Sequence, residues 1–228
     1  MSKITNRFSE KVILAGDKPF KELMHEYYIK QMEKYGSANF SSIEFTGKDL
    51  SGLNLDGADF SGNVFVRTNF DGCSLKNANF EFATISLPLL QSVDLSGCNL
   101  KDTFFHNTLL SDVKLTGATL INTYFNTSNL SKVDITGAKL KTQEGEVFTV
   151  KKWKYYHNAY KYSAAGFISE DNLAFIRLGC FLRSVEAWEK DLWNNKYEFP
   201  DDGSKESIKR LNAYKKCLNW ILKNKEMK

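Results

Sequence analysis

The chain has 228 residues, 42% of them hydrophobic, which allows one extended domain with appendages or two small domains. No apolar run approaches the ~20 residues that a bilayer-crossing helix needs, and nothing resembles a signal peptide, so we expect a cytoplasmic protein without a membrane span. The net charge of +4 is unevenly distributed, because residues 38–142 carry 8 Lys or Arg against 10 Asp or Glu, whereas residues 143–228 carry 16 against 12.

The first segment, residues 1–37, predicts a strand followed by a helix. The apolar run 12–14 indicates the strand. Asp17 suits the cap of a helix, Pro19 its first turn, and Gly36 its end. The large apolar residues between these ends fall at helical spacing on one face: Phe20, Leu23, Met24, Tyr27, Tyr28, Met32 and Tyr35.

From Phe40 to Leu140 every fifth residue is a large apolar one, without exception at 21 positions. A helix repeats its apolar face every 3.6 residues and a strand every 2, so a period of five fits neither. A fixed period of this kind indicates a repeat architecture.

Small side chains and glycines recur with the same period. Ala or Cys often stands two residues before a large apolar position and Gly two residues after it, as in Ala58-Asp59-Phe60-Ser61-Gly62. In these features the chain resembles the pentapeptide-repeat family, whose consensus Ala-(Asp/Asn)-Leu-x-x also fits Ala78-Asn79-Phe80 and Cys98-Asn99-Leu100. The resemblance covers a little under half the chain. It implies a mainly β fold, a right-handed quadrilateral β-helix with one pentapeptide on each side and four in each coil.

The residues support four sides per coil independently of that resemblance. In a 20-residue coil the small residues fall into a single column, whereas a 15-residue coil would scatter them over three sides. The 21 positions then make about five coils within residues 38–142. The expected core consists of Phe45, Phe65, Ile85, Phe105, Phe125, Leu55, Leu75, Leu95, Leu115, Ile135, Ala58, Ala78, Cys98 and Ala118.

The open end of such a β-helix exposes unpaired backbone groups that invite another chain to add on. We expect the helix in the first segment to cover this end of the first coil. The alternative is a helix that binds a partner.

The outward positions of the repeat carry the information about function, because packing accounts for the inward ones. The side built on Leu55, Leu75 and Leu95 has polar flanking residues, so we expect it to be solvated. The side built on Phe45, Phe65, Ile85, Phe105 and Phe125 is flanked by apolar residues, and we predict an interaction surface on it and at its corners: Val64, Val66, Phe82, Leu87, Leu89, Phe104, Leu109 and Tyr124. A monomer rarely leaves such a patch exposed, so we expect the C-terminal helices, a protein partner or a second copy of the chain to cover Phe104 and Tyr124.

Residues 143–228 lose the period of five and predict an α-helical region of three helices. Within residues 151–162 lysines alternate with aromatic residues, a pattern that also suits single-stranded nucleic acid, through phosphate neutralisation and base stacking. The helical spacing of Trp153, Tyr156 and Tyr160 favours a helix with a packed aromatic face. We expect Ser169 to cap a second helix and a last helix to begin at about Ser204.

The sequence offers no catalytic, metal-binding or cofactor-binding constellation. His25, His106 and His157 stand in no spacing with Cys, Asp or Ser that predicts a triad or a metal site. The four cysteines form no CxxC pair, so reduced, buried thiols are favoured over a metal or redox role: Cys73, Cys98, Cys180 and Cys217. We therefore predict a protein without enzyme activity, cofactor or metal.

Three functional hypotheses follow. The first is a rigid scaffold that presents the β-helix surface and its helical cap to a protein partner, with a homodimer as one form of that contact. The second comes from the resemblance, since some family members imitate DNA, bind type II topoisomerases and thereby protect or inhibit gyrase. Duplex DNA carries one negative charge per ~1.7 Å of its axis, whereas residues 38–142 carry only two more acids than bases. The scaffold therefore ranks first, and a nucleic-acid contact through residues 151–162 is the third hypothesis.

Overall fold

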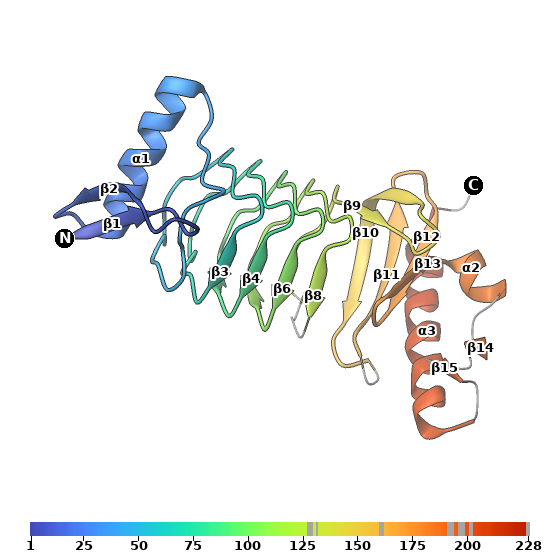
Figure 1. The fold of residues 1–228 in the computed structure, drawn as a ribbon. Helices are drawn as coiled ribbons and strands as arrows, with labels where there is room; N and C mark the ends of the chain where they lie inside the picture. The colour runs from blue at the N-terminus through green and yellow to red at the C-terminus, as the bar shows by residue number, and fades with distance from the viewer. Residues whose placement is uncertain are drawn as a thin grey trace. The chain divides into compact units, whose positions relative to one another are not determined.

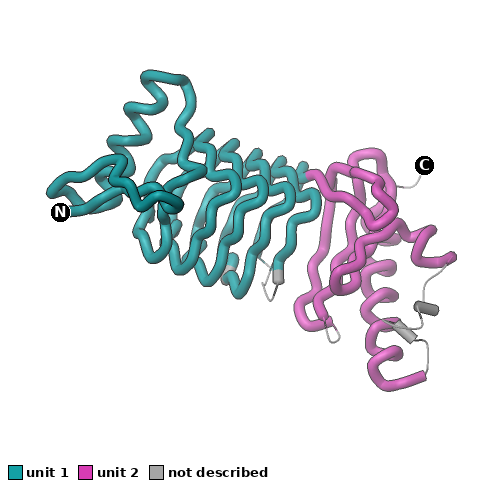
Figure 2. The backbone as a smooth tube through the Cα atoms, in the orientation of Figure 1, with its two compact units in different colours: residues 1–138 teal, residues 139–228 magenta. Residues whose placement is uncertain are grey.

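The computed structural model of the chain describes residues 1–126, 130, 132–159, 162–190, 194–195, 199–200 and 203–226. The chain divides into two compact units, Met1–Ala138 and Lys139–Lys228 (Figure 2). The N-terminal segment and the repeats therefore belong to the same compact unit.

The first unit begins with a hairpin and a helix (Figure 1). Strand β1 (Ser2–Thr5) pairs antiparallel with β2 (Val12–Gly16), so the strand predicted at residues 12–14 is present and has a partner that the sequence analysis missed. Helix α1 (Phe20–Tyr35) follows and buries Leu23, Met24 and Tyr28.

The prediction for the C-terminal end of α1 is confirmed, and the prediction for its N-terminal end is wrong. Gly36 ends the helix as expected, because its φ of 68° lets its N–H bond to Met32 O. At the other end Pro19 occupies the N-cap position and no side chain caps the helix, so the prediction of Asp17 as the cap is wrong. Proline suits this position because its fixed φ is compatible with the start of a helix and it has no N–H to satisfy.

Strands of the repeat pair in parallel with a constant offset. One wall contains four strands side by side: β3 (Val64–Val66), β4 (Thr84–Ser86), β6 (Phe104–His106) and β8 (Tyr124–Asn126) (Figure 1). The next side contains β5 (Leu89–Gln91) and β7 (Leu109–Ser111). Each paired residue lies 20 positions from its partner, as Phe65, Ile85 and Phe105 do, and the isolated parallel bridges such as Asp59 to Asn79 keep that offset. The chain therefore stacks with the 20-residue spacing that the small-residue column indicated.

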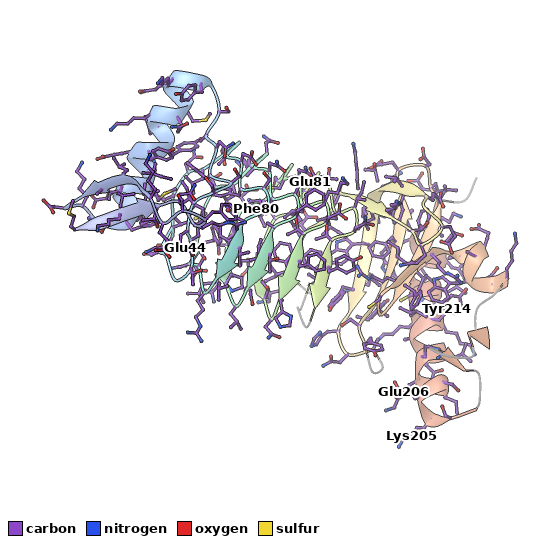
Figure 3. All side chains as sticks on the ribbon, in the orientation of Figure 1. Glu44, Phe80, Glu81, Lys205, Glu206 and Tyr214 are labelled. Atoms are coloured by element: carbon purple, nitrogen blue, oxygen red, sulfur yellow. The ribbon has the colours of Figure 1, made fainter. Side chains whose placement is uncertain are left out.

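Hydrophobic ladders fill the interior of the repeat. The ring centroids of Phe45 and Phe65 are 5.2 Å apart and those of Phe105 and Phe125 are 4.8 Å apart. Phe125 is only partly buried. The other expected core residues are at most 4% exposed: Phe45, Phe65, Ile85, Phe105, Leu55, Leu75, Leu95, Leu115, Ile135, Ala58, Ala78, Cys98 and Ala118. Figure 3 labels the neighbours Phe80, which is 1% exposed, and Glu81, which lies on the outside of the repeat.

Small polar side chains bind successive coils together from within. Thr68 Oγ1 donates a hydrogen bond to Phe45 O (2.8 Å), and Cys73 Sγ donates one to Leu50 O (2.9 Å). Each bond spans 23 positions, so it joins one coil to the coil before it. Burial raises the pKa of the Cys73 thiol to about 11 and that of Cys98 to about 12, so both thiols stay protonated at neutral pH.

The second unit is built on an antiparallel sheet. Its strands lie in chain order across the sheet: β9 (Lys139–Lys141), β10 (Val147–Tyr156), β11 (Ala164–Ser169), β12 (Ala174–Leu178) and β13 (Phe181–Ser184). Its other elements are α2 (Val185–Lys190), α3 (Lys205–Asn224) and a pair of two-residue strands, β14 (Asn194–Asn195) and β15 (Phe199–Pro200).

The prediction of an α-helical region over residues 143–228 is therefore wrong for its first half. Trp153 and Tyr156 lie on β10, and Tyr160 lies outside the described residues. Ser169 ends β11 rather than capping a helix, and its Oγ accepts the Leu173 N–H (3.0 Å) in the turn to β12. Three aromatic residues at this spacing are compatible with a helix and with a strand. Valine, threonine and aromatic residues dominate β10, and their side chains pack well on the pleated surface of a sheet, which favours the strand.

The last predicted helix is present as α3. Ser204 is its N-cap, and its Oγ accepts the Ser207 N–H (3.2 Å). The helix packs against β11 and β12 over a cluster of buried residues: Ala164, Ile168, Ala174, Ile176, Leu178, Trp188, Ala213, Tyr214, Cys217 and Ile221. Burial raises the pKa of Cys217 to about 12. Cys180 is exposed, so the expectation of four buried thiols is wrong at that position.

Candidate functional site

The wall formed by β3, β4, β6 and β8 presents an outward column of Val64, Thr84, Phe104 and Tyr124. Successive members are one coil apart, the spacing of hydrogen-bonded strands. The rings of Phe104 and Tyr124 stack with 4.8 Å between centroids and 8° between planes. The two residues are 49% and 48% exposed, and Val64 is 43% exposed. About half the surface of these three side chains therefore remains accessible to solvent.

Two predicted residues lie at corners of the coil in a strained backbone conformation. Phe82 and Leu87 have φ values of 60° and 49°, in the left-handed region that favours Gly and Asn. The corner that corresponds to Phe82 is Gly62 in the preceding coil and Asp102 in the following one. A bulky residue in this region costs about 1–2 kcal/mol. Phe82 is 62% exposed and Leu87 is 47% exposed, so intramolecular packing offsets little of this cost.

The remaining predicted residues extend beyond the wall. Leu89 is 54% exposed and lies on β5, on the next side of the β-helix. It pairs with Leu109, whose side chain is outside the described part of the structure. Val66 is partly buried. The predicted residues thus occupy one wall, its two corners and the adjacent side, rather than a single flat flank.

A charged cluster borders Phe82. Lys101 Nζ lies 2.7 Å from Glu81 Oε1, 3.6 Å from Asp102 Oδ2 and 5.6 Å from the centroid of the Phe82 ring. The hydrogen bond between Lys101 and Glu81 lowers the pKa of the carboxyl and raises that of the ammonium. Exposed ion pairs contribute little stability. An apolar centre with a charged rim is, however, the usual composition of a protein interface.

The side built on Leu75, Leu95 and Leu115 is polar, as expected. Asp94 and Lys114 bridge one coil to the next on this side. Burial raises the pKa of Asp94, but the hydrogen bonds from Ser96 and the nearby lysines outweigh burial and lower it overall. This polar side provides an internal reference for the apolar wall, because both sides belong to the same coils.

The N-terminal segment meets the first coil through backbone and side-chain contacts. Asn6 and Ile43 form an antiparallel bridge, and the Arg7 N–H donates to Ser42 O (2.8 Å). The Tyr28 hydroxyl of α1 donates to a backbone carbonyl of the repeat (2.8 Å). These contacts join the N-terminal segment to the first coil.

The strained corners are a feature that the sequence analysis did not use, although the signal was present. Gly recurs two residues after the large apolar positions, and Phe82 and Leu87 stand at that same place in the repeat. Counting with the period of five would have identified both as bulky residues in a position that requires a positive φ.

The described residues contain no group of three or more His, Cys, Asp or Glu side chains placed to hold a metal ion. Among the helices in the described part of the chain, none combines the length and the apolar character needed to cross a bilayer.

Parallel strands with a constant offset, a filled interior and hydrogen bonds between successive coils define a β-helical solenoid. A family model described as pentapeptide repeats matches residues 37–62, 54–86, 89–126 and 108–142, in 8 copies. Residues 37–86 and 89–142 therefore consist of pentapeptide repeats, a family whose members form right-handed β-helices, and the resemblance seen in the sequence is confirmed for this part of the chain.

Several solved structures are similar to the chain. The pentapeptide repeat protein Rfr23 from the cyanobacterium Cyanothece 51142 is 16% identical over 52% of this chain and 95% of its own, with a TM-score of 0.33. HetL from Nostoc sp. strain PCC 7120, a pentapeptide repeat protein involved in heterocyst differentiation regulation, is 25% identical over 45% of this chain and 42% of its own, with a TM-score of 0.25. QnrB1, a plasmid-mediated fluoroquinolone resistance protein, is 16% identical over 46% of this chain and 66% of its own, with a TM-score of 0.23. No match was found among curated proteins.

Proposed function

We propose that the chain is a non-enzymatic interaction scaffold, in which the stiff β-helix presents its apolar wall to a protein partner. The match to pentapeptide repeats supports the general class, because pentapeptide repeat proteins are generally structural or interaction proteins. We also propose that the β-helix has about five coils and that the N-terminal hairpin and helix cap the first coil. It also includes a cytoplasmic location.

The observation that carries the proposal is the pair of strained corners beside the exposed ring stack. Phe82 and Leu87 destabilise the fold through their backbone conformation while their side chains stay largely exposed. Strain of this kind concentrates at functional sites, where another requirement outweighs its cost. Binding to a partner would offset the strain, because aromatic and aliphatic side chains that become buried at an interface contribute most of the binding energy.

The second candidate is a DNA-mimicking binder of a type II topoisomerase. It requires a surface of strong negative charge. The repeats carry 8 Lys or Arg against 10 Asp or Glu, and Lys101 and Lys114 interrupt the acidic positions of two sides. The protein scaffold is therefore the function that this surface supports better.

A site-specific crosslinking experiment tests the scaffold. A photo-reactive amino acid at Phe104 should capture a discrete partner in cells that express the chain, and the same amino acid at Lys114, on the polar side, should not. The purified partner should then bind the double variant Phe104→Ser/Tyr124→Ser at least about tenfold more weakly than the unmodified chain, because it loses two anchors. The matched variant Lys76→Ser/Lys114→Ser should keep its affinity.

Equal capture from Phe104 and Lys114, or unchanged affinity of the Phe104→Ser/Tyr124→Ser variant, would contradict the proposal. Analytical ultracentrifugation of the same variants identifies a second copy of the chain as the partner if only the apolar-wall variant becomes monomeric. A gyrase supercoiling assay addresses the second candidate. Inhibition or protection that survives in the apolar-wall variant would favour the topoisomerase hypothesis.

A further inference from the structure

The second unit has a hollow between α3 and strand β10, lined by lysines and aromatic residues. The hollow has a volume of about 270 Å³ and is lined by Tyr156, Lys216, Asn219, Trp220 and Lys223. Four of these residues lie on α3 at intervals of three, four and seven positions, so they form one stripe along the helix. Lys216, Asn219 and Lys223 are exposed, whereas Tyr156 and Trp220 are partly buried.

The position of Trp220 depends on Gly166 of β11. A Cβ atom at Gly166 would lie 3.3 Å from Trp220 Cε3 and 3.3 Å from Cys217 O. The missing side chain therefore allows α3 and its indole ring to approach the sheet closely. This contact holds the ring in place, while its partial exposure leaves some of its surface accessible.

Strand β10 contributes the other edge of the hollow. Lys154 pairs with Gly166 and Tyr156 pairs with Ala164, which belongs to the cluster under α3. Residues paired across two strands project from the same face of a sheet, so Lys154 and Tyr156 lie on the α3 side. Lys216 Nζ lies 4.7 Å from the centroid of the Tyr156 ring. Ammonium groups and aromatic rings are thus interleaved across the hollow.

The lysines of the hollow have no ion-pair partner among the described residues. In the part of the chain that the structure describes, Lys154, Lys216 and Lys223 form no ion pair. Residues 139–228 carry 18 Lys or Arg against 12 Asp or Glu. Residues 152–156 of β10 pair with β11 alone, and lysines on such an edge need no ligand to explain them, because they also discourage edge-to-edge pairing. Protection of an edge does not require aromatic rings, so it does not explain why Tyr156 and Trp220 lie beside these lysines.

We propose that this hollow binds single-stranded nucleic acid. A base stacks on the accessible part of the Trp220 ring or the Tyr156 ring, and the flanking phosphates contact Lys154, Lys216 and Lys223. The Asn219 amide offers a donor and an acceptor to a base edge. Duplexes fit less well, because their base faces are covered by stacking. This activity lies in a different unit from the apolar wall and does not depend on the function proposed for that wall.

The test uses the full chain and a fluorescein-labelled oligothymidylate of about 12 nucleotides, a length within the usual site size of single-strand binders. Fluorescence anisotropy should show binding that weakens with salt. The variant Lys216→Gln/Lys223→Gln should bind at least about tenfold more weakly at low salt, and the slope of log affinity against log salt should fall by about 1.4, or 0.7 for each lost phosphate contact. Trp220→Leu should weaken binding without changing that slope, and Trp220→Phe should restore most of the affinity.

The charge-matched control is Lys114→Gln/Lys139→Gln, which should bind like the unmodified chain. Circular dichroism of each variant separates loss of binding from loss of fold. Four results would overturn the proposal: no binding of the oligonucleotide by the unmodified chain, equal affinity for a duplex of the same length, equal weakening by the control variant, or binding to phosphatidylserine vesicles without binding to the oligonucleotide.

Discussion

The two compact units of this chain bury their apolar residues by different rules. In the first unit each residue of a ladder contacts the residue 20 positions away, which has the same place in the next coil. One spacing in the sequence therefore describes all of these contacts. In the second unit the strands pair antiparallel, and the sequence separation between partners changes at every step along a pair. A regular contact pattern produces a regular sequence, and an irregular one does not.

The difference also affects how a functional feature can be recognised. In the repeat, Phe82 and Leu87 are bulky apolar residues at positions that require a positive φ, whereas most other such positions hold Gly, Asn or Asp. In the second unit, Tyr156 and Trp220 are far apart in the sequence and line one hollow only because β10 and α3 both lie beside β11. Sites in a solenoid can be found by counting, whereas sites in the second unit require the tertiary structure.

The largest expected effect contrasts two neighbouring residues of β6. Phe105 is 1% exposed and Phe104 is 49% exposed. Phe105→Ala should lower the free energy of unfolding by about 3 kcal/mol, since it removes a ring from a close-packed column and leaves a cavity. Phe104→Ala should cost under about 1 kcal/mol. Urea unfolding followed by circular dichroism measures both, and equal destabilisation would contradict the inward and outward assignment of the wall.

The next effect concerns the second unit. Gly166→Ala should lower its stability by about 1–3 kcal/mol, because the added methyl group would press on Trp220 and the backbone of α3. Amide hydrogen exchange should show the loss of protection in residues 139–228, while the repeats keep theirs. If protection fell equally in both units, they would not unfold separately.

A smaller effect, with the opposite sign, is expected at the strained corners. Phe82→Asn and Leu87→Asn should each raise the free energy of unfolding by up to about 1 kcal/mol, because Asn tolerates the left-handed region better than Phe or Leu. Gly62→Ala, at the corner one coil before Phe82, should be destabilising by a similar amount. Thermal unfolding compares the three variants. Destabilisation by the Asn substitutions would mean that the exposed side chains pack better than their accessibility indicates.

The smallest effect is a dependence on pH in the first unit. The hydrogen bonds from the Ser51 and Thr136 backbones lower the pKa of Asp49 and Asp134 below their ordinary 3.8. Their contribution to stability is therefore present above the unfolded pKa and is lost as the pH falls through the lower folded pKa. We expect the melting temperature to fall between about pH 4 and pH 2. Asp49→Asn/Asp134→Asn should make that fall shallower, and an unchanged profile would show that other carboxyls dominate.

The sequence by itself determined the first unit to a considerable depth. An unbroken period of five excluded ordinary helices and strands, and the column of small residues separated a 20-residue coil from a 15-residue one. The apolar outward residues of the predicted interaction surface followed from the same counting. This was feasible because a stacked coil repeats one environment, so each position reports on the corresponding positions in the coils before and after it.

Only the tertiary structure decided the architecture of residues 139–228. Trp153 and Tyr156 suit a helix or a strand equally well, and the choice depends on β11, which pairs with β10 from beyond a turn. The close approach of α3 at Gly166 likewise depends on two segments that are distant from each other in the sequence. Local spacing carries no information about such contacts, because antiparallel pairing and helix packing join segments that share no common period.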